Sequence, residues 1–210
     1  MKVVILAGGF GTRIGEYTNE IPKPMIRIGD KPIIEHIMRR FARFGHKDFY
    51  LALGYKSEVI KQYFLNFSTI NSDFSVNLRS GSINHLSEKL FDWNVNLIDT
   101  GMNSMTGGRI RRLKEFVGNE RFLCTYGDGL SNVDIDSLIN LHDQSNCIAT
   151  VTAVRPNARF GELQIKENVV TSFKEKPQLD QGWINGGFFV FEPQFFDYID
   201  GDNTVLEKEP

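Results

Sequence analysis

The chain has 210 residues, of which 41% are apolar and 24% are charged, and its formal net charge at pH 7 is −2. These proportions are typical of a globular protein with one substantial core. Because the net charge is close to zero, the sequence lacks the strongly basic character of nucleic-acid-binding proteins, and any anionic ligand must be held by individually placed cations. Cys124 and Cys147 lie in apolar runs, which indicates buried thiols in a reducing compartment.

The first predicted element is a short buried strand that begins at Val3, and it leads directly into a glycine-rich loop. Three glycines follow within four positions, and the loop ends on Arg13. Glycines allow a close backbone approach and positive φ angles, so their N–H groups can converge on an anion, and the arginine adds a fixed charge. The pattern predicts a phosphate-binding loop over 8–13, with a ligand-free strand-to-helix turn as the alternative.

Two better-known phosphate loops are excluded by spacing. A dinucleotide-binding loop that began at Gly9 would need a glycine where Ile14 stands. A P-loop needs Gly-Lys followed by Ser or Thr, and the chain has Gly11-Thr12-Arg13 instead. The opening run is also too short for a signal peptide, and no segment approaches the length that spans a bilayer. We therefore expect a cytoplasmic protein with no membrane or nucleic-acid partner.

Lys23 follows this loop between two prolines, Pro22 and Pro24. The prolines restrict the backbone on both sides, so the lysine side chain starts from a stiff, extended segment. A cation held there favours neutralisation of a triphosphate, whereas a solvated lysine in a proline-rich loop is the alternative.

The rest of the first 154 residues alternates between predicted helices and strands. The clearest helix, over 31–45, has an apolar stripe that includes Ile34, Ile37 and Phe41 and ends at Gly45. Further elements are expected as strands over 48–53, 93–99, 121–126 and 147–154, and as helices over 57–65, 109–117 and 134–144. This alternation predicts an α/β fold with a doubly wound, mostly parallel, Rossmann-like sheet and helices on both faces.

Four short polar or glycine-rich clusters follow predicted strands. They are residues 8–13, 54–56, 99–101 and 127–129. Ligands of such sheets bind beyond the carboxyl ends of the strands, so we expect the clusters to share one cleft. Asp128, between two glycines, suits Mg²⁺, and the alternative is an Asp-Gly turn.

Two further groups have possible ligand-binding chemistry. Ser104 and Arg109 flank a glycine pair before a predicted helix, whose N-terminal N–H groups could meet an anion while Arg109 reaches a phosphate or a pyrimidine carbonyl.

From about residue 159 the pattern changes to short strands over 162–166, 169–175 and 183–191, an antiparallel region within a single domain over 1–210. Glu175, Lys176 and Asn185 lie there and could bind sugar hydroxyls and a sugar phosphate, although a surface charge pair and a glycine turn are the alternative.

The motifs together resemble the sugar-1-phosphate nucleotidylyltransferases. The resemblance rests mainly on Leu-Ala-Gly-Gly-Phe-Gly-Thr-Arg (6–13), Pro-Lys-Pro-Met (22–25) and Glu-Lys-Pro (175–177). Asp-Thr-Gly (99–101) and Met-Thr-Gly-Gly-Arg (105–109) resemble the cytidylyl branch, with the thymidylyl and uridylyl branches as alternatives.

This resemblance implies a nucleotide-diphospho-sugar transferase fold and transfer of a cytidylyl group from CTP to glucose 1-phosphate. It further implies Mg²⁺ as cofactor, homo-oligomers, a supply of CDP-sugars for polysaccharides, and a β-rich sugar-binding part over about 159–191. Its catalytic residues are Arg13, Lys23 and Asp128, with Asp128 as metal ligand, and Glu175, Lys176 and Asn185 bind the sugar phosphate. Its nucleotide-binding residues are Leu6, Ala7, Gly8, Gly9, Phe10, Gly11, Thr12, Arg13, Lys23, Ser104, Arg109, Gly127 and Asp128.

Family members also continue into a segment that holds a second Mg²⁺-binding aspartate. No aspartate after Asp128 lies in a comparable motif here. We therefore expect this C-terminal segment to be missing and Mg²⁺ binding to be weakened. A non-catalytic module that binds a nucleotide sugar is the resulting alternative.

Overall fold

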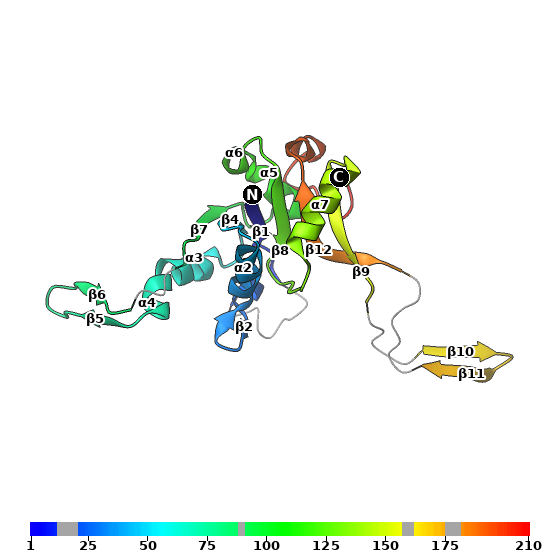
Figure 1. Cartoon of the computed structure of the whole chain (residues 1–210), viewed down its shortest axis with the longest axis horizontal. Helices are drawn as coiled ribbons and strands as arrows, with labels where there is room; N and C mark the ends of the chain where they lie inside the picture. Colours follow the sequence, from blue (N-terminus) through cyan, green and yellow to red (C-terminus); the bar gives the residue numbers. More distant parts are fainter. Residues whose placement is uncertain (12–20, 88–90, 157–161, 175–181) are drawn as a thin grey trace.

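The computed structural model describes residues 1–11, 21–87, 91–156, 162–174 and 182–210. Its centre is a six-stranded sheet in the order β7-β4-β1-β8-β12-β9 (Figure 1). The strands are β1 (Lys2–Leu6), β4 (Asp48–Leu53), β7 (Asn94–Asp99), β8 (Phe122–Tyr126), β9 (Ala149–Val154) and β12 (Ile184–Phe191). The first four strands of this order run parallel, whereas β12 is antiparallel to both β8 and β9.

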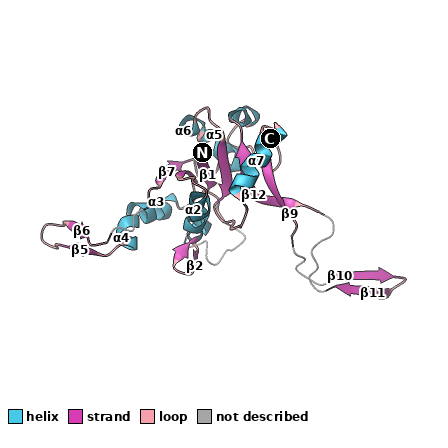
Figure 2. Cartoon of the chain, viewed as in Figure 1, coloured by secondary structure: helices cyan, strands magenta, loops and turns pink. Residues whose placement is uncertain are grey.

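Helices cover both faces of the sheet, as Figure 2 shows. One face packs against α2 (Ile33–Arg43), α3 (Ser57–Leu65) and α7 (Ile135–Ser145), and the buried side chains there include Ile37 and Phe41. The other face packs against α5 (Thr106–Arg112), α6 (Lys114–Val117) and the 3₁₀ helix η3 (Pro193–Tyr198). Because both faces are covered, β1 is a continuous apolar run in which Val3, Val4 and Ile5 are fully buried. The predicted doubly wound, mostly parallel sheet is confirmed.

Several predicted elements differ from the structure by one or two residues at their ends, and three differences have a clear structural cause. The helix expected from residue 31 begins at Ile33, because β3 (Lys31–Pro32) is extended and pairs with β2 (Arg27–Ile28). The single helix expected over 109–117 is two short helices, α5 and α6, which meet at Leu113.

The last predicted strand is placed differently. β12 enters the main sheet between β8 and β9 instead of pairing with the small antiparallel region. Residues 188–191 are four consecutive buried apolar residues, a pattern that requires cover on both faces and that a two-stranded ribbon cannot supply.

Two hairpins project away from this body (Figure 1). The hairpin of β10 (Glu162–Lys166) and β11 (Val169–Lys174) was predicted from the sequence. The hairpin of β5 (Phe74–Val76) and β6 (Ile83–His85), which follows α4 (Phe67–Asn71), was not. Within the described residues, no helix combines the length and apolar character needed to cross a membrane.

Candidate active site

A cavity of about 850 Å³ lies at the carboxyl ends of β1 and β8. Eleven predicted site residues line it: Leu6, Ala7, Gly8, Gly9, Phe10, Gly11, Lys23, Ser104, Arg109, Gly127 and Asp128. The other lining residues are Pro24, Asn103, Met105, Thr106, Tyr126 and Glu207. Thr12, Arg13, Glu175 and Lys176 lie outside the described residues. Asn185 does not line the cavity but bonds to Tyr126, which does.

The glycine loop is held to the neighbouring strand ends by backbone hydrogen bonds. The N–H of Tyr55 donates to the carbonyl of Gly8 at 3.1 Å, and the N–H of Gly127 donates to Leu6 at 2.9 Å. A Cβ on Gly8 or Gly54 would overlap the Arg109 guanidinium. Gly11 has a φ of +72°, which favours glycine. The glycines therefore allow close contact between backbone segments as well as access to the cavity.

Lys23 and Asp128 meet across the cavity. The Lys23 Nζ lies 3.4 Å from the Asp128 carboxylate, and their side chains are 17% and 46% exposed. Lys23 begins the 3₁₀ helix η2 (Lys23–Met25), and the ring of the following Pro24 would lie 3.0 Å from a Cβ on Gly127. The proline frame thus holds the Lys23 cation beside the Asp128 carboxylate, a pairing that the sequence did not predict.

The Asp128 carboxylate suits a hard cation that keeps water and phosphate oxygens as its other ligands. Among the described residues, no group of three or more His, Cys, Asp or Glu side chains could hold a metal ion. Mg²⁺ usually takes only one or two protein carboxylates, so the partly exposed Asp128 fits it.

Arg109 is placed differently from the expectation that it reaches a phosphate or a base carbonyl. It is only 4% exposed. Its terminal nitrogens donate to the carbonyls of Leu53, Gly101, Gly8 and Met102 and to the Thr100 hydroxyl, at 2.8 to 3.1 Å. Burial lowers the pKa of Arg109, and Asp99 opposes that shift. The guanidinium joins the ends of β1, β4 and β7, and its donors are already taken by protein oxygens.

The N-terminus of α5 is also not open to an anion, contrary to the sequence-based expectation. The N–H of Met105 donates to the Asp202 carbonyl at 2.8 Å, and those of Gly107 and Gly108 donate to the Thr204 carbonyl at 3.0 and 3.2 Å. A Cβ on Gly107 would come within 2.8 Å of the Thr204 carbonyl oxygen. The glycine pair makes room for residues 201–207, which cap the helix. Ser104 is buried, and its hydroxyl donates to the Thr100 carbonyl at 2.6 Å.

Sequence reasoning missed Tyr126 and Glu207. The Tyr126 hydroxyl donates to Glu207 at 2.5 Å, and the Asn185 amide donates to the Tyr126 hydroxyl at 3.0 Å. Tyr126 could have been found, because it directly precedes Gly127 and Asp128 at a strand end. Glu207 has no local signal, since its partner is 81 residues away in the chain.

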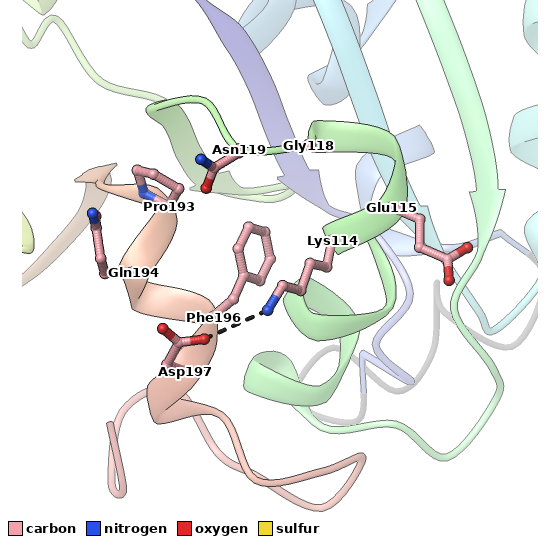
Figure 3. A pocket seen from close by; sticks show the side chains of 8 residues that line it. All are labelled: Lys114, Glu115, Gly118, Asn119, Pro193, Gln194, Phe196 and Asp197. Atoms are coloured by element: carbon pink, nitrogen blue, oxygen red, sulfur yellow. Dashed lines mark hydrogen bonds and ion pairs between the residues drawn. The ribbon is translucent and has the colours of Figure 1, made fainter.

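A second, smaller hollow of about 320 Å³ lies between α6 and η3 (Figure 3). Lys114 pairs with Asp197 at 3.5 Å beside Phe196. None of the predicted site residues lines this hollow.

Comparison with known proteins agrees with this geometry. The Nucleotidyl transferase family matches residues 2–209. The chain is 48% identical to a glucose-1-phosphate cytidylyltransferase of Salmonella typhimurium and 43% identical to a probable one of Bacillus subtilis, in each case over the whole chain and 82% of the relative. The fold resembles that of HddC from Yersinia pseudotuberculosis complexed with GMP-PN, with a TM-score of 0.71 at 24% identity over 99% of this chain and 83% of that one. The chain therefore belongs to the nucleotidyl transferase family.

Proposed function

We propose that this protein transfers a cytidylyl group from CTP to α-D-glucose 1-phosphate and produces CDP-glucose and pyrophosphate. The observation that carries the proposal is the 48% identity to a glucose-1-phosphate cytidylyltransferase over the whole chain. The cavity at the carboxyl ends of β1 and β8, with its glycine loop, Lys23 and Asp128, supports it from the structure.

The proposed reaction needs no nucleophilic side chain. A phosphate oxygen of the sugar phosphate attacks the α-phosphorus of CTP in line, the bond to the β-phosphate oxygen breaks, and pyrophosphate leaves. A phosphate monoester with a second pKa of about 6 is already largely dianionic at neutral pH. The protein contributes by positioning the reactants and neutralising developing charge.

Each cluster has a proposed part in that task. Residues 6–11 bind the nucleotide phosphates, with Thr12 from the same sequence motif, and Arg13 and Lys23 offset charge at the reacting phosphates. Glu175, Lys176 and Asn185 bind the sugar phosphate. Asp128 would hold Mg²⁺, which supplies further charge neutralisation when bound. Because Lys23 pairs with Asp128 at 3.4 Å, this pair must separate for both side chains to serve the substrates.

Turnover with each nucleoside triphosphate tests the proposal. The chain is incubated with Mg²⁺, glucose 1-phosphate and CTP, dTTP, UTP or GTP, and pyrophosphate is measured. We expect CTP to give the highest rate, and we expect Asp128→Ala to abolish turnover while the folded state persists by circular dichroism. The matched control is Asp73→Ala, an exposed aspartate at the base of the β5–β6 hairpin.

Two results would replace the proposal with another function. Equal or faster turnover with dTTP or UTP would indicate the thymidylyl or uridylyl reaction. Binding of CDP-glucose by calorimetry, without pyrophosphate release, would indicate a non-catalytic nucleotide-sugar-binding module.

We also propose a homo-oligomer that acts in the cytoplasm and supplies CDP-sugars for polysaccharide synthesis. The projecting hairpins support the oligomer, because β5 and β6 expose apolar side chains such as Phe74 and Ile83. Both cysteines are free thiols, which is consistent with a reducing compartment. Cys124 is buried as expected, whereas the expectation that Cys147 is buried is wrong, because it is exposed.

A further inference from the structure

A chain of side-chain hydrogen bonds connects α5, β8, β12 and Glu207 at one side of the cavity. Thr106 on α5 donates to one carboxylate oxygen of Glu207 at 2.8 Å, and the Tyr126 hydroxyl on β8 donates to the other at 2.5 Å. The Asn185 amide on β12 donates to the Tyr126 oxygen at 3.0 Å. Thr106, Tyr126 and Glu207 all line the cavity.

The protons in this chain run in one direction. The Tyr126 hydroxyl has a single proton, which it donates in the hydrogen bond to Glu207. The phenolic oxygen is therefore left to accept a hydrogen bond from the Asn185 amide. The Asn185 carbonyl oxygen accepts from the N–H of Gly187 at 2.8 Å. Turning the amide over would put its N–H₂ against that N–H and its oxygen against the phenolic oxygen. The Gly187 N–H and the Tyr126 oxygen, whose own proton points to Glu207, therefore favour the same orientation of the Asn185 amide.

The tyrosine ring is held as firmly as its hydroxyl. A Cβ on Gly187 would come within 2.8 Å of the ring, and Gly187 has a φ of +81°. The ring also contacts Phe189 edge-on, with centroids 5.8 Å apart.

Residues 201–207 place the carboxylate. Their carbonyls cap α5 through Met105, Gly107 and Gly108, and the N–H of Leu206 donates to the Thr106 hydroxyl at 2.9 Å. This backbone docking brings Glu207 to the cavity, where it contacts Thr106 on α5 and Tyr126 on β8.

We propose that Glu207 and Tyr126 are positioning residues for the sugar phosphate: Glu207 fixes the Tyr126 hydroxyl, and Tyr126 fixes the Asn185 amide with one N–H left for the substrate. The inference rests on the proposed function, because that function assigns Asn185 to the sugar phosphate. It predicts that these residues affect the sugar phosphate more than the nucleotide.

Steady-state kinetics of Tyr126→Phe test this inference. The variant loses one oxygen and both hydrogen bonds, so we expect the KM for glucose 1-phosphate to rise about three- to tenfold while the KM for CTP stays within about twofold. Glu207→Ala should shift the same constant in the same direction. Glu207→Gln should have a smaller effect, because its amide oxygen can still accept from Tyr126. The matched control is Tyr198→Phe, since Tyr198 is 56% exposed and its hydroxyl bonds to no described residue.

The double variant Tyr126→Phe/Glu207→Ala separates one chain from two independent effects. If Glu207 acts through Tyr126, the double variant is no worse than Tyr126→Phe alone. Additive losses, or a KM for CTP that rises as much as that for the sugar phosphate, would overturn the inference.

Calorimetry with glucose 1-phosphate distinguishes this inference from the proposed function. If the wild-type chain binds the sugar phosphate without turnover, the proposed function fails, and weaker binding by Tyr126→Phe still supports the inference. If Tyr126→Phe binds as tightly as wild type, the inference fails while the function stands. If the wild-type chain does not bind glucose 1-phosphate, both fail.

Discussion

At the scale of single residues, Arg109 shows how burial changes the meaning of a conspicuous side chain. An arginine beside two glycines ahead of a helix is a typical phosphate ligand in sequence terms. In the folded chain it is 4% exposed and bonds to the carbonyls of Gly8, Leu53, Gly101 and Met102. Its N–H groups satisfy carbonyls at the ends of β1, β4 and β7.

Arg109→Met should therefore act first on stability. The substitution keeps much of the volume but removes every donor to these buried carbonyls, so we expect the free energy of unfolding to fall by about 3 kcal/mol. Urea denaturation measures it, with Arg111→Met on the exposed side of the same helix as control. A loss similar to that of Arg111→Met would contradict the structural role.

At the scale of elements, α5 and residues 201–207 form one unit. The helix begins with a glycine pair, and the backbone of Asp202 and Thr204 lies directly against it. Residues 201–207 form neither a strand nor a helix, so the two segments are not joined by strand pairing or by helix–helix packing. Their contact depends on the missing side chains of Gly107 and Gly108.

Gly108→Ala should disrupt this unit. The added Cβ would overlap the Asp202 backbone, including its carbonyl carbon at 2.6 Å, and a backbone neighbour cannot turn aside as a flexible side chain can. We expect a loss of about 1–3 kcal/mol of stability and weaker sugar-phosphate binding, measured by urea denaturation and calorimetry. Gly201→Ala is the matched control in the same segment, because its Cβ would contact only Arg111 at 3.7 Å. Equal effects of the two substitutions would argue against close backbone contact as the cause.

The same unit gives a prediction about pH. The hydrogen bonds from Arg112, at 2.5 and 2.8 Å, lower the pKa of Asp202 below its ordinary value. A lowered folded-state pKa stabilises the fold above the unfolded value of about 3.9, and this contribution is lost as pH falls through the folded-state value. Asp202→Asn should thus lower Tm at pH 7, and its difference from wild type should shrink below about pH 4.

Asp73→Asn is the control for that measurement. Its carboxylate is exposed and bonds to no described residue. We expect its Tm to match wild type at both pH values. A wild-type to Asp202→Asn difference that is unchanged in acid would show that the ion pair with Arg112 does not contribute.

At the scale of the whole molecule, the strand order and the two hairpins matter most. The order β7-β4-β1-β8 places four consecutive parallel strand ends side by side, so the predicted clusters lie along one edge. They do not share one cleft as expected, because of these clusters only residues 8–11 and 127–128 line the cavity among the described residues. The hairpins leave this body, and β5–β6 exposes Phe74, Val76, Leu78 and Ile83, between 41% and 91% of each side chain.

This exposure predicts that the hairpin is covered in an assembly. We expect light scattering after size-exclusion chromatography to give a multiple of the chain mass for wild type, and smaller species for Leu78→Ser/Ile83→Ser. Leu141→Ser, which changes an exposed leucine of α7 on the body, is the control. A wild-type monomer would contradict the prediction.

Residue patterns within one segment predict those helices and strands whose bounds depend on that segment alone. The strand 48–53 and the helix 57–65 were predicted with the bounds they have in the structure, because their apolar spacing and flanking residues are sufficient. The place of β12 was not predictable in this way. Its run of buried residues indicates a covered strand, but only the pairing with β8 and β9 shows which sheet covers it.

The sequence by itself determined the fold class and the place of the four clusters at strand ends, since these follow from apolar runs and the glycines that directly follow them in the chain. Only the tertiary structure decided that Arg109 bonds to carbonyls, that α5 is capped by residues 201–207, and that Glu207 reaches Tyr126. Those contacts join residues 81 to 101 positions apart, or a side chain to backbone that folding buries. Such contacts depend on how closely two segments pack, and no spacing within either segment encodes that distance.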